Sequence, residues 1–347
     1  MGTQEISGKS IFLTGGAGFI GTSLVQRLVE RNKISVFDNG HRNSLRDCPA
    51  WTHPNLSFIH GDILNYDLLC AAIRKAAPDM VLHLAAIAGV DTVLRVPTRT
   101  MKINFIGTYN VLEATVANSR NVERFVDFST SEVFGTHVYH AEEMSATTLG
   151  TVGEARWTYA VSKLAAEHLV HNYGKETGLP TVSIRPFNVF GPRQMGVGAI
   201  HTFAVRALKD LPMEIHGDGN QIRAWCYIDD MVDGIILTLT NPDAVGHVFN
   251  IGNPRGTVTI NTLAEKIKTL ARSNSEIIFV KKDYVDVELR IPSIQKATRL
   301  LGFEPKIDLN EGLIRTIEWY RAQLGSGSTS GLIHECREHV GSPAGNP

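Results

Sequence analysis

Three glycines near the start of the chain, Gly15, Gly18 and Gly21, constrain the fold more than any other feature. They follow a short apolar run at 11–13 and precede a segment, 22–31, with helical spacing. Glycine lets the backbone turn tightly and approach a phosphate, which the amide groups of a helix N-terminus then face. The order strand, turn, helix predicts a dinucleotide-binding turn, although G-x-x-G-x-x-G departs from the commoner G-x-G-x-x-G. The predicted cofactor contacts in this turn are Gly15, Gly18, Phe19 and Ile20.

The next predicted strand, 34–38, ends in the acid Asp38, which is followed by Asn39. Its carboxylate can accept hydrogen bonds from both hydroxyls of an adenosine ribose and would repel a 2′-phosphate. Both residues are therefore predicted cofactor contacts, with NAD favoured over NADP. An ordinary turn at 38–40 is compatible with this role. Arg42 would weaken the preference if it paired with a phosphate.

Composition excludes several classes of function. A formal net charge of −1 gives no positive field for nucleic acid or an anionic membrane. No apolar run reaches the roughly 18 residues that cross a bilayer, and a signal-peptide pattern is missing. The cysteines lack disulfide or metal-ligand spacing, which favours a reducing cytoplasm and predicts no metal site. They are Cys48, Cys70, Cys226 and Cys336.

Strand and helix patterns alternate over the first 185 residues. The apolar runs and helical stretches lie at 56–59, 68–76, 80–84, 102–117, 125–128, 159–173 and 181–184. This alternation predicts an α/β fold, a Rossmann-type doubly wound parallel sheet with helices on both faces.

The chain divides by composition into three parts. Residues 1–185 are predicted to form the NAD-binding domain, rejoined by a segment at about 225–252. Glycine and proline become frequent at 186–324, which predicts a smaller C-terminal substrate-binding domain. The Gly/Ser-rich stretch 325–347 is predicted to be a flexible tail, and its histidines and Cys336 are interpreted as solvated rather than metal-binding.

Candidate chemistry begins with Tyr159 and Lys163, which are four residues apart and so share a helix face. A nearby positive charge lowers the pKa of a phenol, whose ordinary value is about 10, and lets it act as a base. Such a tyrosine can take a hydroxyl proton while a nicotinamide takes the hydride from carbon. An amphipathic surface helix would show the same spacing by chance, and the glycine turn favours the catalytic interpretation.

The chain resembles the extended short-chain dehydrogenase/reductase family over roughly residues 9 to 322, and more narrowly its nucleotide-sugar branch. Besides the glycine turn and the Tyr159–Lys163 pair, the resemblance rests on motifs at 61–63, 84–86, 104, 129–135, 185–188 and 250–254. It implies further contacts to the cofactor, at Asp62, Ile63, Leu84, Ala85, Ala86, Asn104, Tyr159 and Lys163. It also implies contacts to a nucleotide-sugar substrate, at Asn188, Arg223 and Arg290.

The triplet Thr130-Ser131-Glu132 bears on the reaction, and the resemblance makes all three residues catalytic. Thr130 would hydrogen-bond the 4-hydroxyl of the sugar, beside Tyr159. Relatives that only invert carbon 4 usually carry no acid at the position of Glu132. Once carbon 4 is a ketone, a carboxylate can remove the proton on carbon 5 and water can leave from carbon 6. If carbon 6 is itself a carboxylate, the β-keto acid loses carbon dioxide instead.

Decarboxylation is favoured because the triplet is similar to that of UDP-glucuronate decarboxylases, and 156–159 and 284–293 resemble other decarboxylases of this branch. A 4,6-dehydratase or a 4-epimerase is the alternative, since GDP-mannose-type dehydratases share the triplet. A non-catalytic cofactor-sensing protein has no need for Thr130, Tyr159 and Lys163 together. By the same resemblance, helices at 102–117 and 159–173 would pair in a homodimer.

Overall fold

A computed structural model describes residues 5–119, 121–196, 198–281 and 286–325 of the chain. At its centre lies a seven-stranded sheet with the order β12-β7-β5-β4-β1-β2-β3, in which all neighbours are parallel. Its strands are β1 (Ser10–Thr14), β2 (Lys33–Asp38), β3 (Leu56–His60), β4 (Met80–His83), β5 (Arg124–Phe128), β7 (Thr181–Pro186) and β12 (Val248–Ile251). This architecture confirms the predicted α/β fold with a Rossmann-type parallel sheet.

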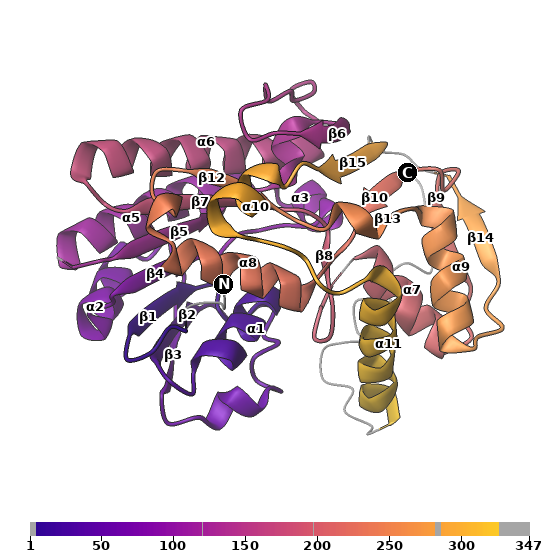
Figure 1. The fold of residues 1–347 in the computed structure, drawn as a ribbon, viewed down its shortest axis with the longest axis horizontal. Helices are drawn as coiled ribbons and strands as arrows, with labels where there is room; N and C mark the ends of the chain where they lie inside the picture. The colour runs from indigo at the N-terminus through magenta and orange to yellow at the C-terminus, as the bar shows by residue number, and fades with distance from the viewer. Residues whose placement is uncertain (1–4, 120, 197, 282–285, 326–347) are drawn as a thin grey trace, which may run out of the picture.

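Helices cover both faces of this sheet (Figure 1), because alternate strand residues point to opposite sides. On β1, Ile11 and Leu13 join one buried cluster together with Leu24, whereas Phe12 joins a second cluster with Leu69. The first cluster lies under α1 (Phe19–Leu28) and α8 (Ile228–Thr240). The second lies under α2 (Tyr66–Ala76), α5 (Gly107–Asn118) and α6 (Ala155–Thr177).

The connection from β4 to α5 differs from the single predicted helix at 102–117. It contains α3 (Val90–Arg95), α4 (Pro97–Met101) and one π-helical turn, Lys102–Ile106, before α5 begins at Gly107. A π turn inside a helical run often marks a functional position. Here it contains the fully buried Asn104, one of the predicted cofactor contacts.

The part of the chain after β7 builds smaller sheets at one end of the large one (Figure 1). A four-stranded sheet has the order β13-β10-β15-β6, and the pairs β11-β8 and β14-β9 stand apart from it. The strands of these smaller sheets are β6 (His137–Ala141), which precedes β7 in the chain, and β8 (Val189–Phe190), β9 (Met213–His216), β10 (Ile222–Ala224), β11 (Cys226–Tyr227), β13 (Thr257–Thr259), β14 (Ile277–Val280) and β15 (Leu289–Pro292). The helices that accompany them are α7 (Ala199–Leu208), α9 (Ile260–Ala271), α10 (Gln295–Leu301) and α11 (Leu309–Gly325).

One strand from this later part returns to the large sheet, since β12 pairs with β7 through Val248–Ser183 and the residues that follow. It lies within the segment 225–252 that the sequence directs back to the sheet. The predicted flexible tail lies outside the described residues, apart from Gly325. Within the described ranges, no helix has the length and apolar character needed to cross a membrane.

Candidate active site

Close backbone packing shapes the glycine turn between β1 and α1. Gly15 has a φ of +69°, and a Cβ there would lie 2.5 Å from the Ala85 amide nitrogen. A Cβ on Gly21 would lie 2.6 Å from the Gly16 Cα. A Cβ on Gly18 would meet only the Gly15 carbonyl oxygen, at 3.3 Å. Packing therefore requires glycine at 15 and 21, whereas Gly18 presents open backbone.

Helix α1 begins directly after Gly18, and no side chain caps its first amide groups. Phe19 and Ile20 are the first two residues of the helix. Uncapped amides at a helix N-terminus carry partial positive charge and need acceptors. Together with the open backbone at Gly18, they fit the pyrophosphate of a dinucleotide.

Asp38 lies at the end of β2, beside this turn. Its two carboxylate oxygens accept hydrogen bonds from the amides of Ala17, at 3.1 Å, and Gly40, at 2.8 Å. Burial raises the pKa of Asp38 above its ordinary value, and these amide bonds oppose that shift. The carboxylate is thus fixed at the carboxyl edge of the sheet, where a ribose would lie. Asn39 accepts a hydrogen bond from the His41 amide at 3.0 Å and closes the turn.

The ends of β3 and β4 carry the other predicted cofactor contacts. Asp62 follows β3 and accepts a hydrogen bond from the Leu64 amide at 2.9 Å, and Ile63 is buried. Asn104 bonds the Ile87 amide at 2.8 Å and the Ser162 hydroxyl at 3.0 Å. It therefore ties the stretch after β4 to α6, next to Lys163. That stretch begins with Leu84, Ala85 and Ala86.

Thr130, Ser131 and Glu132 follow β5 in a short 3-10 turn, Ser131–Phe134. The Thr130 hydroxyl accepts a hydrogen bond from the Glu132 amide at 3.2 Å, and it also bonds the Tyr159 hydroxyl. Ser131 is buried. The structure thus brings the triplet together with the tyrosine of the Tyr159–Lys163 pair, as the sequence predicts.

The electrostatic surroundings of Tyr159 differ from the sequence-based expectation. Burial and the negative charge of Glu132 raise the pKa of the Tyr159 phenol to about 12 in this structure. The expected lowering by Lys163 is not found. Its ammonium group lies 3.7 Å from a carboxylate oxygen of Asp127, and that negative charge also raises the pKa of Tyr159.

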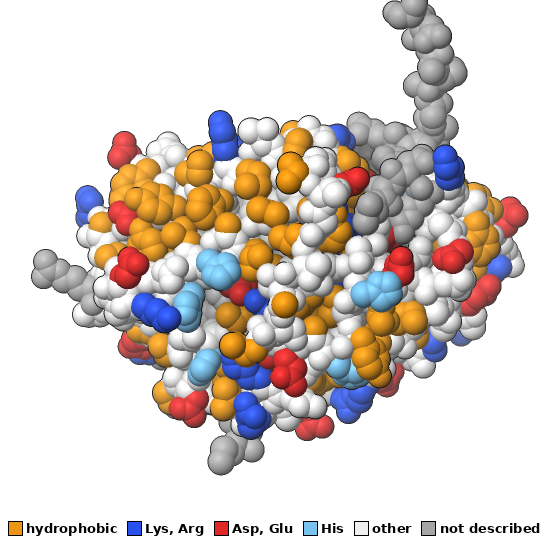
Figure 2. Space-filling model, turned by 90° about the horizontal axis from the view of Figure 1, so that it is seen from above, with side chains coloured by type: hydrophobic (Ala, Val, Ile, Leu, Met, Phe, Trp, Pro, Cys, Tyr) orange, Lys and Arg blue, Asp and Glu red, His pale blue; other side chains and the backbone are white. Residues whose placement is uncertain are grey.

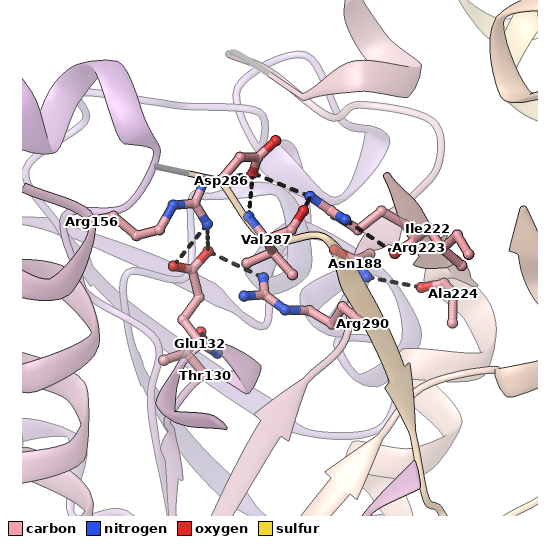
Figure 3. A network of polar contacts seen from close by, with 10 residues as sticks. All are labelled: Thr130, Glu132, Arg156, Asn188, Ile222, Arg223, Ala224, Asp286, Val287 and Arg290. Carbon is pink, nitrogen blue, oxygen red and sulfur yellow. Dashed lines mark hydrogen bonds and ion pairs between the residues drawn. The ribbon is translucent and has the colours of Figure 1, made fainter. Parts of the chain in front are cut away.

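Two guanidinium groups hold the Glu132 carboxylate (Figure 3). Arg156 reaches both oxygens, at 3.1 and 3.2 Å, and Arg290 reaches one of them at 3.2 Å. Arg156 lies on α6 one turn before Tyr159, so both side chains point toward the same end of the sheet. Glu132 is thereby held in one orientation by charge-assisted hydrogen bonds.

Asp286 extends this network to the later part of the chain (Figure 3). One of its carboxylate oxygens lies 3.0 Å from Arg156 and 3.1 Å from Arg223. Arg223 and Arg290 lie opposite each other on β10 and β15, which explains how both reach this point. The sequence did not identify Arg156 and Asp286 as site residues, although both lie in stretches that resemble decarboxylases.

Two of the predicted substrate contacts, Arg223 and Arg290, are buried arginines. Burial lowers the pKa of Arg223 to about 10 and also lowers that of Arg290. The Arg290 Nε and Nη2 groups are buried and have no hydrogen-bond partner among the described residues. Buried donors of this kind can donate to a ligand oxygen. Asn188 lies nearby, donates to the Ala224 carbonyl at 3.0 Å and adopts a φ of +33° (Figure 3).

Comparison with known proteins agrees with this geometry. Residues 11–252 match the model of the NAD dependent epimerase/dehydratase family. A UDP-N-acetyl-alpha-D-glucosaminuronate decarboxylase of Bacillus cytotoxicus is 31% identical over 90% of this chain and 98% of its own. The UDP-glucuronic acid decarboxylase 5 of Arabidopsis thaliana is 35% identical over 92% of this chain and 91% of its own.

The fold is also similar to that of a solved relative, the UDP-glucuronic acid 4-epimerase of Bacillus cereus, in complex with UDP-glucuronic acid and NAD. That structure has a TM-score of 0.82 and 30% identity, covering 90% of this chain and 99% of its own. The family match, the relatives and the arrangement of Thr130, Tyr159 and Lys163 beside the glycine turn point to one conclusion. The chain belongs to the NAD dependent epimerase/dehydratase family.

Proposed function

We propose that this chain is an NAD-dependent enzyme that decarboxylates UDP-glucuronate after oxidation of its carbon 4. The observation that carries the proposal is the position of Glu132 between Arg156 and Arg290, next to the Thr130–Tyr159 pair. Arg290 retains two buried N–H groups that a sugar carboxylate or a phosphate would satisfy. A neutral hexose offers no charge at carbon 6 for this arrangement.

The reaction follows from the chemistry of the substrate. Tyr159 would take the proton of the 4-hydroxyl as its phenolate, and the positive nicotinamide of bound NAD would oppose the upward shift that burial and Glu132 give the Tyr159 pKa. Thr130 would hold the same oxygen by a hydrogen bond. Bound NAD would supply the hydride acceptor for the oxidation at carbon 4 and the hydride donor for the final reduction. The resulting 4-ketone makes carbon 6 the carboxylate of a β-keto acid, so the bond from carbon 5 to carbon 6 breaks and carbon dioxide leaves. The electron pair stays on the sugar as an enolate, which takes one proton from solvent at carbon 5, beside Glu132.

The cofactor assignment is supported by the residues at the carboxyl ends of β1 to β4. Gly18 and the first amides of α1 would hold the pyrophosphate, and Asp38 would bind the adenosine ribose. Lys163 would bind a hydroxyl of the nicotinamide ribose. Asp38 would repel a 2′-phosphate, which favours NAD over NADP.

A 4-epimerase is the second candidate, because the solved relative of Bacillus cereus carries UDP-glucuronic acid and is named a 4-epimerase. The two reactions share the oxidation at carbon 4 and diverge at the ketone. Glu132 supports decarboxylation, because relatives that only invert carbon 4 usually carry no acid at this position. A 4,6-dehydratase would need a neutral hexose and a leaving hydroxyl on carbon 6.

A homodimer is proposed in addition, formed through the outer faces of α5 and α6. These faces expose large apolar side chains in the described structure, and Figure 2 shows hydrophobic groups gathered over this part of the molecule. They include Tyr109 and Val116 of α5 and Val161 of α6, and Ile106 at the end of the π-helical turn is exposed as well. Contiguous exposed apolar surface of this kind is typical of an interface. A reducing cytoplasm would suit the free cysteines Cys48, Cys70 and Cys226.

Proton NMR of the purified chain with NAD tests this proposal. The substrates are a panel of UDP-, dTDP-, GDP- and CDP-sugars that includes UDP-glucuronate. The expected result is conversion of UDP-glucuronate to a UDP-pentose, with loss of this activity in Tyr159→Phe. A methyl doublet formed from a neutral hexose, with UDP-glucuronate unchanged, would make the chain a 4,6-dehydratase instead.

A further inference from the structure

A row of polar side chains crosses the middle of the large sheet. Thr14 on β1 pairs in register with His83 on β4, His83 with Asp127 on β5, and Asp127 with Ser183 on β7. All four lie on the side of the sheet that α5 and α6 cover, and none is more than 3% exposed. Strands buried on both faces are normally apolar, so a polar row here needs a cause.

Hydrogen bonds account for the histidine in this row. The His83 ring bonds the Thr14 hydroxyl at 2.7 Å and the Thr108 hydroxyl at 2.8 Å, one through each nitrogen. Burial and the positive charge of Lys163 lower the pKa of His83 to about 3. His83 is therefore neutral at physiological pH and supplies no positive charge to Asp127.

Asp127 is different from its neighbours in the row. It is fully buried, and burial raises the pKa of its carboxyl group, a shift that the positive charge of Lys163 opposes. A buried carboxylate is unfavourable in its charged form and is retained only beside a compensating charge. The Lys163 ammonium, 3.7 Å away and itself 2% exposed, is that charge.

The other charged groups around the pair are already engaged. Glu167, one turn after Lys163 on α6, forms two hydrogen bonds with Arg185 of β7, at 2.6 and 2.9 Å. Glu132 and Arg290 form a hydrogen bond with each other next to Tyr159. Asp127 on β5 and Lys163 on α6 thus form a buried ion pair, and α6 also carries Tyr159.

We propose that Asp127 is a positioning residue for Lys163, whose ammonium group it holds in place and keeps charged inside the fold. Asp127 contacts neither substrate nor cofactor and acts only through the lysine. The inference rests on the proposed function, in which Lys163 binds a ribose hydroxyl and assists Tyr159. Burial disfavours the charged form of a lysine, and a nearby carboxylate favours it.

The substitution Asp127→Asn tests this proposal, because it removes the charge and keeps the shape. An opposite charge at this distance stabilises an ammonium by about 1–3 pKa units. The pKa of Lys163 should therefore fall by about that amount in Asp127→Asn. It can be followed by NMR of lysine-labelled protein, with the Lys163 signal assigned by its loss in Lys163→Arg. The alkaline limb of the kcat/KM profile should move to lower pH by the same amount.

A matched control is Asp230→Asn. Asp230 is 2% exposed and accepts hydrogen bonds from the Lys306 and Ile307 amides, at 2.7 and 3.1 Å. The substitution Asp230→Asn should lower the stability of the fold and leave the Lys163 pKa unchanged. Asp127→Glu, which restores the charge, should return the Lys163 pKa toward the wild-type value. A Lys163 pKa that is the same in wild type and Asp127→Asn would overturn the proposal.

A measurement on the wild-type chain covers the case in which Asp127→Asn does not fold. The carboxyl carbon of Asp127 should have the chemical shift of an ionised group at pH 7, and a protonated Asp127 would contradict the proposed pairing. Both NMR readouts are independent of turnover. If UDP-glucuronate is not a substrate, the proposed function fails, while the effect of Asp127 on Lys163 is still decided.

Discussion

At the scale of single residues, the carboxylates at the reaction centre depend on cations from distant parts of the chain. Glu132 is held by Arg156 from α6 and Arg290 from β15, and Asp286 connects Arg156 to Arg223. Such charge-assisted hydrogen bonds are directional, so they fix the orientation of Glu132 as well as its charge. We therefore expect loss of Arg156 to affect the chemical step more than substrate binding.

Substitution of Arg156 tests this expectation. In Arg156→Met, Glu132 loses a charge-assisted contact, made by one guanidinium nitrogen, that is worth about 1.5–3 kcal/mol. The kcat for UDP-glucuronate should fall by about 10- to 100-fold, with a smaller change in KM. Arg156→Lys keeps the charge without the planar guanidinium and should lie between this variant and wild type. A KM increase with unchanged kcat would instead place Arg156 in substrate binding.

Site residues with a local pattern could be named from the sequence, whereas contacts that form only in the fold could not. The spacing of Tyr159 and Lys163 and the triplet at 130–132 are local patterns. Arg156 and Asp286 are 130 positions apart, and their pairing depends on how β15 meets α6. Asp127 was hidden because 125–128 reads as an apolar strand. The raised pKa of Tyr159 likewise reflects burial and Glu132, which sequence spacing does not show.

At the scale of elements, the glycine turn separates the demands of folding from those of binding. The backbone of Gly18 has a φ of −69°, and a Cβ there would have a single close neighbour. Gly21, by contrast, packs against the backbone of Gly16. The two glycines therefore serve different purposes within one motif.

Alanine substitutions at these positions should have opposite effects. Gly18→Ala should change stability by no more than about 1 kcal/mol, because alanine adopts this φ readily while its Cβ would lie 3.3 Å from the Gly15 carbonyl oxygen. Its affinity for NAD should fall at least about tenfold, because the methyl group occupies the approach of the pyrophosphate. Gly21→Ala should lose about 1–3 kcal/mol of stability through overpacking. Calorimetry with NAD and thermal unfolding measure both, and tight NAD binding by Gly18→Ala would contradict this assignment.

The contact between α7 and α11 carries a pH-dependent contribution to stability. His201 bonds the Tyr320 hydroxyl at 2.9 Å, and burial lowers the pKa of His201 to about 4. Below the unfolded pKa of about 6.5, the unfolded chain binds a proton that the folded chain excludes, so stability falls as pH falls. This loss stops near the folded pKa.

When the pH is lowered from 7 to 5, the contribution of His201 should therefore reduce the free energy of unfolding by about 2 kcal/mol. In His201→Gln this contribution is absent, so the loss of stability over the same range should be smaller by that amount. Urea unfolding of both proteins at the two pH values gives the comparison. Equal losses in the two proteins would show that His201 can be protonated within the fold.

At the scale of the whole molecule, the sequence predicted the large sheet and left the smaller sheets undefined. The runs that became β3, β4, β5 and β7 are apolar and separated by helical patterns, which is the signature of parallel strands. The later strands have two to four residues each, for example β8 and β10, and are too short to show a period. Their arrangement nevertheless decides which arginines reach Glu132.

The proposed dimer is a property of the same scale. Sedimentation velocity at micromolar concentration should show a dimer, and Val116→Glu should shift it toward monomer, because a charge would be buried at the interface. Phe279 on β14 is 59% exposed and lies away from α5 and α6. Phe279→Glu is therefore the control and should remain dimeric. A wild-type monomer under these conditions would refute the interface.

The central claim is that carbon 6 leaves the sugar. UDP-glucuronate labelled with ¹³C at carbon 6, incubated with the chain and NAD, tests this most directly by ¹³C NMR. We expect the label to appear as carbon dioxide and bicarbonate while a UDP-pentose accumulates. A label that remains in a UDP-hexuronate of inverted carbon 4 would contradict the account and make the chain a 4-epimerase.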